Sequence, residues 1–381
     1  MRIGIVTGEY PPMQGGVGAY AAILARALAN AGHRVRLCTR TAAHSAPSDH
    51  SNVHIDPIIT RWNWRALQQV RTWAQAQQLE IVNIQFQTAA FDMSPWIHFL
   101  PAVLRPIPIV TTFHDLRVPY LFPKAGKLRE WIVMQLAKSS AGVILTNHED
   151  EQHLSNLPRR ALIPIGSNIV KDLGNSFNAS NWRQRAHATE QDFLIAYFGL
   201  ANHTKGLDAL ITALSNLRSQ GLPAKLVMIG SVAGSSDPTN RTFAEQLNAY
   251  IDQTGMRPFI HQTGFVDEHE VGAYLTAADV VALPFRDGAS FRRGSLMAPI
   301  HYGCAIVTTT PSVAIPEFQD RQNMLLVRAD HVSELTEALY HLYESPALRE
   351  QLKRGALALK PLFDWDQIAK QTIDLFKQVV Q

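Results

Sequence analysis

Short apolar runs alternate with segments of helical period along the whole 381-residue chain. The apolar runs are rich in Val, Ile and Leu and alternate little with polar residues, as expected for parallel strands covered on both faces. Helical patterns lie between many of them, for example over residues 18–31, 207–220 and 240–254. This order predicts an α/β fold of doubly wound parallel sheets. The predicted strands cover residues 2–7, 34–39, 81–86, 108–113, 142–146, 161–165, 193–199, 225–230, 259–263, 279–285, 304–309 and 323–327.

The length favours two domains, because a single core rarely grows to 381 residues. The stretch 170–190 is polar, is broken by Gly and Asn, and precedes a new apolar run, so it is the predicted boundary. We therefore expect one Rossmann-like domain over residues 1–175 and a second over 185–364. A last segment, 365–381, has a helical period.

Composition narrows the class of protein. Hydrophobic residues make up 46% of the chain and charged residues 18%, which is typical of a globular protein and excludes a disordered or fibrous one. Cys38 and Cys304 lie in or beside apolar runs, so we expect buried, reduced thiols. The start of the chain lacks the pattern of a signal peptide, and no apolar run is long enough to span a bilayer, so we expect a cytoplasmic protein.

The charge is divided unevenly. Residues 1–180 hold 17 of the 35 Lys and Arg residues but only 11 of the 32 Asp and Glu residues. This basic excess fits an anionic ligand or an anionic membrane surface. It is too small to predict nucleic-acid binding, and no motif for such binding accompanies it.

The segment 287–303, DGASFRRGSLMAPIHYG, is the strongest candidate site. It follows the apolar run 279–285 and opens a helical pattern that ends at Gly303. Guanidinium groups beside a helix N-terminus, with small residues that let backbone N–H groups approach, form an anion site, and the expected anion is a phosphate. The structural alternative is that these arginines are solvated. The candidate ligands are Ser290, Arg292, Arg293, Gly294 and Ser295.

Three other motifs follow predicted strands. Gly15 and Gly16 lie between the first strand and the first helix, where glycines allow a ligand to approach the helix N-terminus, although a simple tight turn explains them too. Their spacing does not match the dinucleotide fingerprint, so we do not expect an NAD site. Lys205 follows the strand 193–199, and His114 follows the strand 108–113. Each lies where α/β domains bind ligands, yet each is also compatible with a purely structural or surface role.

The order and spacing of these motifs resemble those of GT-B glycosyltransferases of the family 4 type over nearly the whole chain. The family has a double-glycine loop after its first strand, a histidine in a context like TTFHDL, and a glycine and lysine spaced as in Gly199 and Lys205. Residues 279–284 match its D-V-x-x-x-P run, and residues 303–307 loosely match its G-x-P-V-V run. The resemblance implies two Rossmann-like domains that face a cleft, with the last helix crossing back to the first domain.

Two departures from the family pattern affect the expected site. Leu200 occupies the position of an arginine that usually contacts phosphate, and Ser290 and Ala298 occupy the positions of the E-x7-E pair. We therefore hypothesise a relocated site, in which Arg292 or Arg293 contacts the diphosphate together with Lys205. Asp287, near the position of the first glutamate, would then hold sugar hydroxyls.

The resemblance implies a hexosyltransferase-like enzyme of polysaccharide or glycoconjugate biosynthesis that moves a sugar from a nucleotide-sugar donor, with retention, to a glycan, lipid-linked or small-molecule acceptor. It implies no metal and no cofactor, since cationic side chains can neutralise the diphosphate. The expected catalytic residues are His114, Asp287 and Lys205. The expected donor-binding residues are Gly15, Gly16, Gly199, Lys205, a phenylalanine and a valine placed at positions 266 and 267, Ser290, Arg292, Arg293, Gly294 and Ser295.

Alternative functions remain open from sequence. A nucleotide-sugar epimerase of the same fold would share the diphosphate site but needs further acid–base carboxylates. The missing glutamates also fit a catalytically inactive nucleotide-sugar binder.

Peripheral contact with the inner face of a membrane is a further expectation, because basic and aromatic residues are interleaved in the first domain. Ordinary amphipathic packing with a solvated charged face is the alternative. The residues concerned are Trp62, Trp64, Arg65, Arg71, Trp73, Lys124, Lys127, Arg129 and Trp131.

Overall fold

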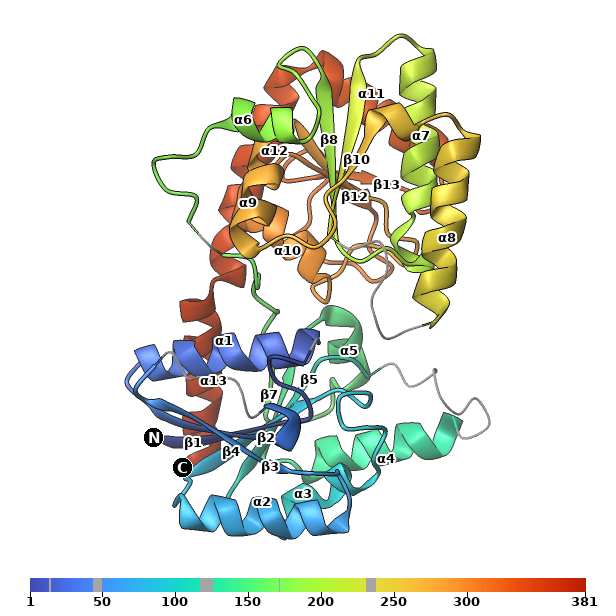
Figure 1. Cartoon of the computed structure of the whole chain (residues 1–381). Coiled ribbons are helices and arrows are strands. Elements are labelled where there is room, and N and C mark those ends of the chain that lie inside the picture. Colours follow the sequence, from blue (N-terminus) through green and yellow to red (C-terminus); the bar gives the residue numbers. More distant parts are fainter. Residues whose placement is uncertain (14, 44–49, 117–125, 171, 231–237) are drawn as a thin grey trace. The chain divides into compact units, whose positions relative to one another are not determined.

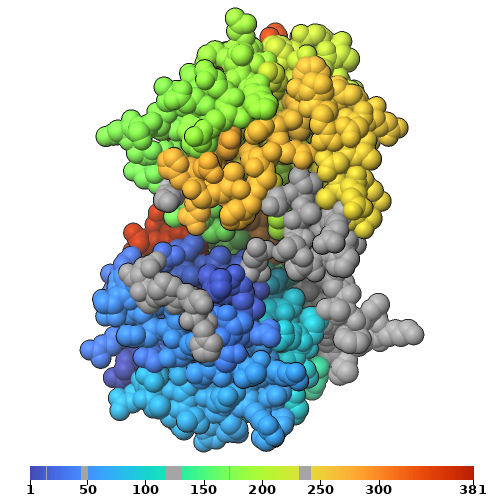
Figure 2. All heavy atoms as spheres, in the orientation of Figure 1, coloured from blue at the N-terminus to red at the C-terminus, as the bar shows by residue number. Residues whose placement is uncertain are grey.

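The computed structural model describes residues 1–13, 15–43, 50–116, 126–170, 172–230 and 238–381, and in 126–130 and 238–241 it describes the backbone only. The chain divides into two compact units (Figure 1). The first unit contains Met1–Asn168 together with Leu362–Gln381, and the second contains Ile169–Pro361. On the face drawn in Figure 2, the first unit is coloured mainly blue to cyan and the second mainly green to orange.

The first unit is built on a seven-stranded sheet in the order β3-β2-β1-β4-β5-β6-β7, and every neighbouring pair is parallel. Helices α1 and α13 cover one face, and α2, α3 and α4 cover the other (Figure 1). Its strands are β1 (Arg2–Thr7), β2 (Arg34–Arg40), β3 (Val53–Ile59), β4 (Ile81–Phe86), β5 (Ile109–Phe113), β6 (Gly142–Leu145) and β7 (Arg160–Leu162). Its helices are α1 (Gly16–Asn30), α2 (Trp64–Ala76), α3 (Leu100–Val103), α4 (Gly126–Ser139), α5 (His148–His153) and α13 (Trp365–Val380), with short 3-10 turns η1 (Thr41–Ala43) and η2 (Trp96–Phe99).

The second unit has a six-stranded sheet in the order β10-β9-β8-β11-β12-β13, again with parallel neighbours. Helices α7 and α8 lie on one side of this sheet, and α9, α10 and α12 lie on the other (Figure 1). Its strands are β8 (Phe193–Phe198), β9 (Ala224–Ile229), β10 (Ile260–Gln262), β11 (Val280–Leu283), β12 (Ile306–Thr309) and β13 (Leu325–Val327). Its helices are α6 (Ala179–Arg185), α7 (Leu207–Ser219), α8 (Pro238–Gln253), α9 (Glu268–Ala277), α10 (Gly294–His301), α11 (Val332–Glu344) and α12 (Pro346–Leu359), with 3-10 turns η4 (His203–Lys205) and η5 (Arg257–Phe259). A further 3-10 turn, η6 (Lys360–Phe363), spans the boundary between the two units.

Strand order fixes where each unit can bind a ligand. In each sheet the first three strands in sequence are added toward one edge, and the later strands are added toward the other edge. The order reverses between β1 and β4 in the first unit and between β8 and β11 in the second. The carboxyl ends of strands at such a switch point leave a crevice between divergent loops. The predicted Gly15-Gly16 loop follows β1, and Lys205 and the segment 287–303 follow β8 and β11.

One strand, β3, lies outside the set that the apolar pattern predicts. It is an edge strand, pairs only with β2 in the sheet order, and contains Pro57. Most of its residues are only partly buried, so it lacks the continuous apolar run that reveals a central strand. Proline is tolerated there because one side of an edge strand makes no ladder hydrogen bonds.

The last helix, α13, belongs to the first unit. Its apolar side, which includes Ile368 and Phe376, is buried in the same core as α1 and β1. The Trp365 indole N–H donates to the carbonyl of Ser167 at 2.7 Å. A Cβ at Gly166 would lie 2.6 Å from the Trp365 ring, so glycine allows this close approach.

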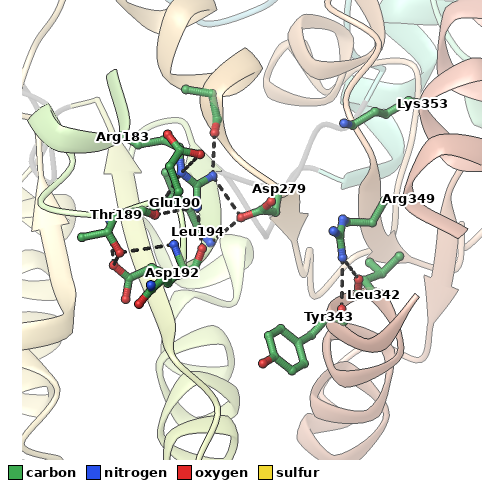
Figure 3. A network of polar contacts seen from close by, with 12 residues as sticks. Arg183, Thr189, Glu190, Asp192, Leu194, Asp279, Leu342, Tyr343, Arg349 and Lys353 are labelled. Carbon is green, nitrogen blue, oxygen red and sulfur yellow. Dashed lines mark hydrogen bonds and ion pairs between the residues drawn. The ribbon is translucent and has the colours of Figure 1, made fainter. Parts of the chain in front are cut away.

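The polar stretch 170–190 contains a structural anchor as well as the predicted boundary. Helix α6 lies within it and belongs to the second unit. Arg183 of α6 is only 6% exposed and donates to the Ala277 carbonyl at 3.0 Å and to the Asp279 carboxylate at 3.1 Å (Figure 3). The same carboxylate accepts from the backbone N–H of Leu194 at 2.8 Å. The aspartate of the D-V-x-x-x-P motif therefore ties α6 to the starts of β8 and β11.

Candidate functional site

Two cationic side chains converge on one aromatic ring in the second unit. Lys205, in η4 after β8, places its ammonium nitrogen 4.8 Å from the centroid of Phe285. Arg293, which precedes α10, places its guanidinium carbon 4.8 Å from the same centroid. Phe285 is fully buried just after β11. The chain thus gathers two positive charges at the carboxyl ends of β8 and β11, and we call Lys205, Phe285 and Arg293 the cation cluster.

The surroundings of Lys205 in the cation cluster lower its pKa. Burial, together with the nearby Arg293 charge, lowers the pKa of Lys205 to about 8, and Asp287 partly opposes both effects. Burial disfavours a charged ammonium because it removes water, and a like charge adds repulsion. An anion bound here would restore the ordinary protonation of the lysine.

Asp287 forms an ion pair with Arg293. Its carboxylate therefore neutralises part of the cation cluster, a role that the sequence hypothesis did not include. That hypothesis assigned Asp287 to sugar hydroxyls, and no contact in the described part of the chain tests this assignment.

The N-terminus of α10 completes the cluster. The side chain of its N-cap residue, Arg293, makes no capping hydrogen bond, and the first N–H groups of a helix carry partial positive charge. The Lys205 ammonium donates to the Ser295 hydroxyl at 3.4 Å, which joins η4 to this helix. Gly199 has a φ of 132°, and a Cβ there would lie 3.3 Å from Ser295, so glycine permits the close approach of the β8 loop to α10.

Other candidates in this unit lie outside the cation cluster. Arg292 donates through its backbone N–H to the Ser290 hydroxyl at 3.3 Å, whereas the guanidinium over the Phe285 ring is that of Arg293. Leu200, at the family's arginine position, is 51% exposed. Ala298, at the second glutamate position, is fully buried in α10.

The expected donor contact of a phenylalanine and a valine at positions 266 and 267 is wrong by one residue. Those positions hold Val266 and Asp267, and the Phe-Val pair is Phe265-Val266. Asp267 is the N-cap of α9, and its carboxylate accepts from the backbone N–H of Glu270 at 2.9 Å. An aspartate is favoured at such a position because it satisfies a free N–H group of the first turn. Phe265 is 85% exposed, and the described contacts do not join this segment to Lys205.

In the first unit, a carboxylate occupies the helix N-terminus that the glycine loop exposes. Glu9 accepts hydrogen bonds from the N–H groups of Val17 at 3.0 Å and Gly18 at 3.2 Å. A Cβ at Gly15 would lie 2.0 Å from the Glu9 carboxylate, whereas a Cβ at Gly16 would meet open space. Gly15 is therefore needed for the approach of Glu9. The sequence reasoning missed Glu9, although an acidic residue so close to a glycine loop is the signal that could have revealed it.

His114 lies directly after β5 and is held on two sides. Its Nε2 is 2.8 Å from Oε1 of Gln85, and its ring meets the edge of the Tyr20 ring with centroids 4.7 Å apart. Burial lowers the pKa of His114 to about 3. The imidazole is therefore neutral at physiological pH, which suits hydrogen bonding better than charge neutralisation.

Family models match both units. A model described as Glycosyltransferase Family 4 matches residues 14–167, and one described as Glycosyl transferases group 1 matches residues 192–345. A D-inositol 3-phosphate glycosyltransferase of Paenarthrobacter aurescens is 22% identical over 96% of this chain and 93% of its own length. A phosphatidyl-myo-inositol mannosyltransferase of Mycobacterium tuberculosis is 22% identical over 100% and 97%.

Solved structures share the fold. The sucrose-phosphate synthase of Thermosynechococcus elongatus superposes with a TM-score of 0.79 at 17% identity, covering 100% of this chain and 99% of that one. HepE of Anabaena, solved in complex with UDP, superposes with a TM-score of 0.77 at 16% identity, covering 99% and 100%. The predicted fold, two doubly wound α/β domains of the GT-B type, is confirmed. The chain belongs to the GT-B glycosyltransferases of the family 4 type.

Proposed function

We propose that this glycosyltransferase takes its sugar from a nucleoside-diphosphate donor, whose diphosphate binds at the cation cluster. The main support is that Lys205 and Arg293 both contact the Phe285 ring at the switch point of the second sheet. Two cations beside a helix N-terminus match the charge of a diphosphate. HepE, which has the same fold, was solved with UDP and with UDP-glucose, and this supports the choice of ligand.

The transfer step follows from this placement. The bond between the anomeric carbon and the diphosphate oxygen breaks, and its electron pair stays on the diphosphate. The acceptor hydroxyl forms the new glycosidic bond and gives its proton to the departing diphosphate. Negative charge grows on the diphosphate as the bond breaks, so contacts from Lys205 and Arg293 strengthen in the transition state and accelerate the step. We propose retention of anomeric configuration, which NMR of the product would test.

Metal independence is part of the same proposal. The cation cluster supplies the positive charge that a divalent ion would otherwise bring to a diphosphate. We expect transfer activity to persist in excess EDTA, and loss of activity that Mg²⁺ or Mn²⁺ restores would contradict this.

The acceptor is proposed to be a glycan or a lipid-linked molecule at an anionic membrane surface, in glycoconjugate biosynthesis. The relatives include an inositol-phosphate and a phosphatidylinositol glycosyltransferase. Exposed aromatic side chains on α2, η2 and α4 support membrane contact. These elements are neighbours, because η2 contacts both α2 and α4. They are Trp64, Trp96, Phe99 and Trp131, with exposures of 55%, 41%, 56% and 58%.

The other residues of the membrane expectation divide into three groups. Trp62 and Trp73 are buried in the core, so they support ordinary packing. Arg65 and Arg71 are exposed on α2. Lys124, and the side chains of Lys127 and Arg129, lie outside the described residues. No helix in the described part of the chain is long and apolar enough to cross a membrane.

Flotation with vesicles tests the membrane contact. We expect the protein to float with vesicles containing phosphatidylglycerol and not with pure phosphatidylcholine, and the Trp64→Ser, Trp131→Ser double variant to float less. Flotation that the double variant leaves unchanged would overturn the assignment of this surface.

Calorimetry with UDP tests the diphosphate site directly. Arg293→Ala should weaken UDP binding about 10- to 100-fold, because a charge-assisted contact contributes roughly 1.5–3 kcal/mol. Arg292→Ala is the matched control, since it removes the same charge from the same loop, and we expect a loss below about threefold. A larger loss in Arg292→Ala than in Arg293→Ala would reverse the assignment. Wild-type UDP affinity in both variants would overturn the relocated site.

A further inference from the structure

A cavity opens in the first unit at the amino ends of β1, β2 and β3. Its volume of about 280 Å³ is close to the lower end of the range for small-molecule sites, about 300–1,000 Å³. None of the described residues that line it is acidic. The Gly15–Gly16 loop follows the carboxyl end of β1, so the cavity lies at the opposite end of the sheet from that loop. We call it the arginine pocket, and its polar lining includes Arg2, Arg34, Arg36, Ser51, Asn52 and His54.

The register of the sheet places the basic side chains of the arginine pocket side by side. Arg2 of β1 lies opposite Arg34 of β2. Arg36 of β2 lies opposite His54 of β3. Arg34 and Arg36 are alternate residues of one strand, so all four side chains lie on the same face of the sheet. Like charges on neighbouring strands repel, and a bound anion would relieve that repulsion.

Two of the three guanidinium groups are held in place and still keep free donors. Arg36 donates through Nε and one terminal nitrogen to the two carboxylate oxygens of Asp56, at 2.8 and 2.5 Å. Arg2 donates through Nε to the Gln78 carbonyl at 2.6 Å, and its Nε lies 3.8 Å from the Glu80 carboxylate. The second terminal nitrogen of Arg36 and both terminal nitrogens of Arg2 make no hydrogen bond with a described residue. These nitrogens can therefore donate to a ligand.

Arg34 supplies the uncompensated charge. Within the part of the chain that the structure describes, its guanidinium group has neither an ion pair nor a hydrogen bond. The side chains of Ser51, Asn52 and His54 also make no hydrogen bond with a described residue. Three guanidinium groups are thus offset by two described carboxylates, and the excess charge at the arginine pocket is positive.

We infer that the arginine pocket is a second anion site, separate from the cation cluster, and that its ligand carries a phosphate monoester. Such a group bears close to two negative charges near pH 7 and three strong acceptor oxygens, which match guanidinium donors. The anchored arginines lose little side-chain freedom when they bind it. The cavity has more room than a phosphate ion fills, so the ester includes a small organic part. Both a soluble sugar phosphate and the headgroup of phosphatidic acid have this chemistry.

NMR of the full-length protein with 15N-labelled histidine tests the site without any activity measurement. His54 lines the arginine pocket, and His54→Gln assigns its ring signals by their loss. We expect these signals to shift on titration with glucose 6-phosphate and to stay unmoved with glucose, which lacks the phosphate. Signals of His54 that stay unmoved at millimolar glucose 6-phosphate would overturn the inference.

Three variants test the charge of the pocket by calorimetry with glucose 6-phosphate, in an Arg293→Ala background that weakens the cation cluster. Arg34→Gln should lower the affinity about tenfold, because it removes a charge-assisted contact. Asn52→Asp keeps the side-chain shape and adds a negative charge, so it should fold normally and also lower the affinity about tenfold. Arg26→Gln is the matched control, because Arg26 is exposed on α1, which covers the other face of the sheet, and we expect a loss below about twofold.

Equal losses of affinity in Arg34→Gln and Arg26→Gln would overturn the site, because they would show only general attraction to a basic protein. Wild-type affinity in both Arg34→Gln and Asn52→Asp would overturn it as well.

Flotation with vesicles that contain phosphatidic acid distinguishes the two sources of the phosphate. Weaker binding of glucose 6-phosphate by Arg34→Gln, with unchanged flotation, would support a soluble phosphate ester. Reduced flotation of Arg34→Gln, with flotation of Arg26→Gln unchanged, would support the lipid headgroup. A protein that binds neither glucose 6-phosphate nor these vesicles through Arg34 would contradict the phosphate site.

Discussion

Lys205 and Arg293 lie against the same aromatic ring, each with its charged group 4.8 Å from the centroid of Phe285. They come from loops after two adjacent strands, β8 and β11. The two positive charges repel each other, and cation–π attraction to the single Phe285 ring offsets only part of that repulsion. Asp287 neutralises Arg293 in part. The remaining positive charge makes these strand ends an attractive place for an anion.

Donor binding should weaken as the pH rises through about 8. Burial and Arg293 lower the pKa of Lys205 from 10.5 to about 8, so the free protein loses this charge above pH 8. The affinity for UDP should then fall toward about tenfold per pH unit. Lys205→Arg keeps its charge, and its affinity should stay level over the same range. Calorimetry from pH 7 to 9.5 compares the two proteins, and ionisation of UDP affects both alike. A parallel decline in both would contradict a role for lysine deprotonation.

The same pKa shift predicts the sign of a stability effect. Between pH 8 and 10.5 the unfolded chain holds a proton on Lys205 that the folded protein has lost. The contribution of Lys205 to stability therefore rises with pH through this window and is lowest below pH 8. Urea unfolding at several pH values should show this rise in wild type and not in Lys205→Met.

Gly206→Ala should strongly destabilise the second unit and displace Lys205. Gly206 has a φ of 65°, and a Cβ there would lie 2.1 Å from the Pro284 carbonyl oxygen. We expect a loss of about 2–5 kcal/mol, which combines the left-handed conformation with a backbone clash. Gly221→Ala is the matched control, because its φ is 85° but a Cβ would meet open space. It should cost only about 1–2 kcal/mol by urea unfolding. If Gly206→Ala and Gly221→Ala lose the same stability, the backbone around Pro284 must shift and relieve the clash at little cost.

Glu9 and Gly15 should be energetically coupled. Glu9→Ala removes the bonds to Val17 and Gly18 and should cost about 1 kcal/mol, typical of a lost helix cap. Gly15→Ala should cost a similar amount by displacing the carboxylate. The double variant should then cost clearly less than the two single losses together. Gly16→Ala, which meets open space, is the control and should change stability by less than about 0.5 kcal/mol. Additive losses would contradict the coupling.

Arg183 should be a major determinant of stability in the second unit. Arg183→Ala removes the cationic partner of the Asp279 carboxylate, which keeps only its bond from the Leu194 N–H among the described contacts, and it removes donors from backbone carbonyls (Figure 3). We expect a loss of about 3–5 kcal/mol in urea unfolding. Arg185→Ala, on the same helix, breaks an exposed pair with Glu270 at 3.5 Å and a cation–π contact with the Trp182 ring at 4.4 Å, and it should cost at most about 1.5 kcal/mol. Comparable losses of stability in Arg183→Ala and Arg185→Ala would mean that burial does not strengthen the contacts of Arg183.

Ribose recognition should be weak in this chain. Ala298 is fully buried in α10, so neither its methyl group nor a small replacement can reach a ribose hydroxyl. Calorimetry should give dUDP and UDP affinities within about threefold of each other, because no strong bond to the 2′-hydroxyl is lost. A preference for UDP over dUDP of tenfold or more would mean that another residue hydrogen-bonds to the 2′-hydroxyl of the ribose.

The predictable parts of the fold were those with a strong local signal. Central strands such as β1 and β8 read as continuous apolar runs because both faces are covered. The edge strand β3, with Pro57 and partial burial, has no such signal. Helix α13 begins and ends where its apolar period does, at Trp365 and Val380. Its apolar side packs against α1 and β6, yet the period is visible without knowledge of those partners.

The candidate site was only partly predictable. Loops after strands at a switch point are a general property of α/β folds, which is why Lys205 and the 287–303 segment could be found. The choice between Arg292 and Arg293 depends on the turn that precedes α10, and no local pattern determines it. Gln85 is separated from His114 by one whole crossover, although two amides within the apolar run IVNIQF were a visible clue.

By itself, the sequence determined the alternation of strands and helices, the family and the strand ends at which a ligand can bind, because each depends on local periodicity or motif spacing. Only the tertiary structure decided which side chains meet. It brought Lys205 and Arg293 to one ring, Glu9 to the N-terminus of α1, and Gln85 to His114. The physical reason is that these contacts join strands and loops far apart in sequence, and parallel pairing with its register brings them together.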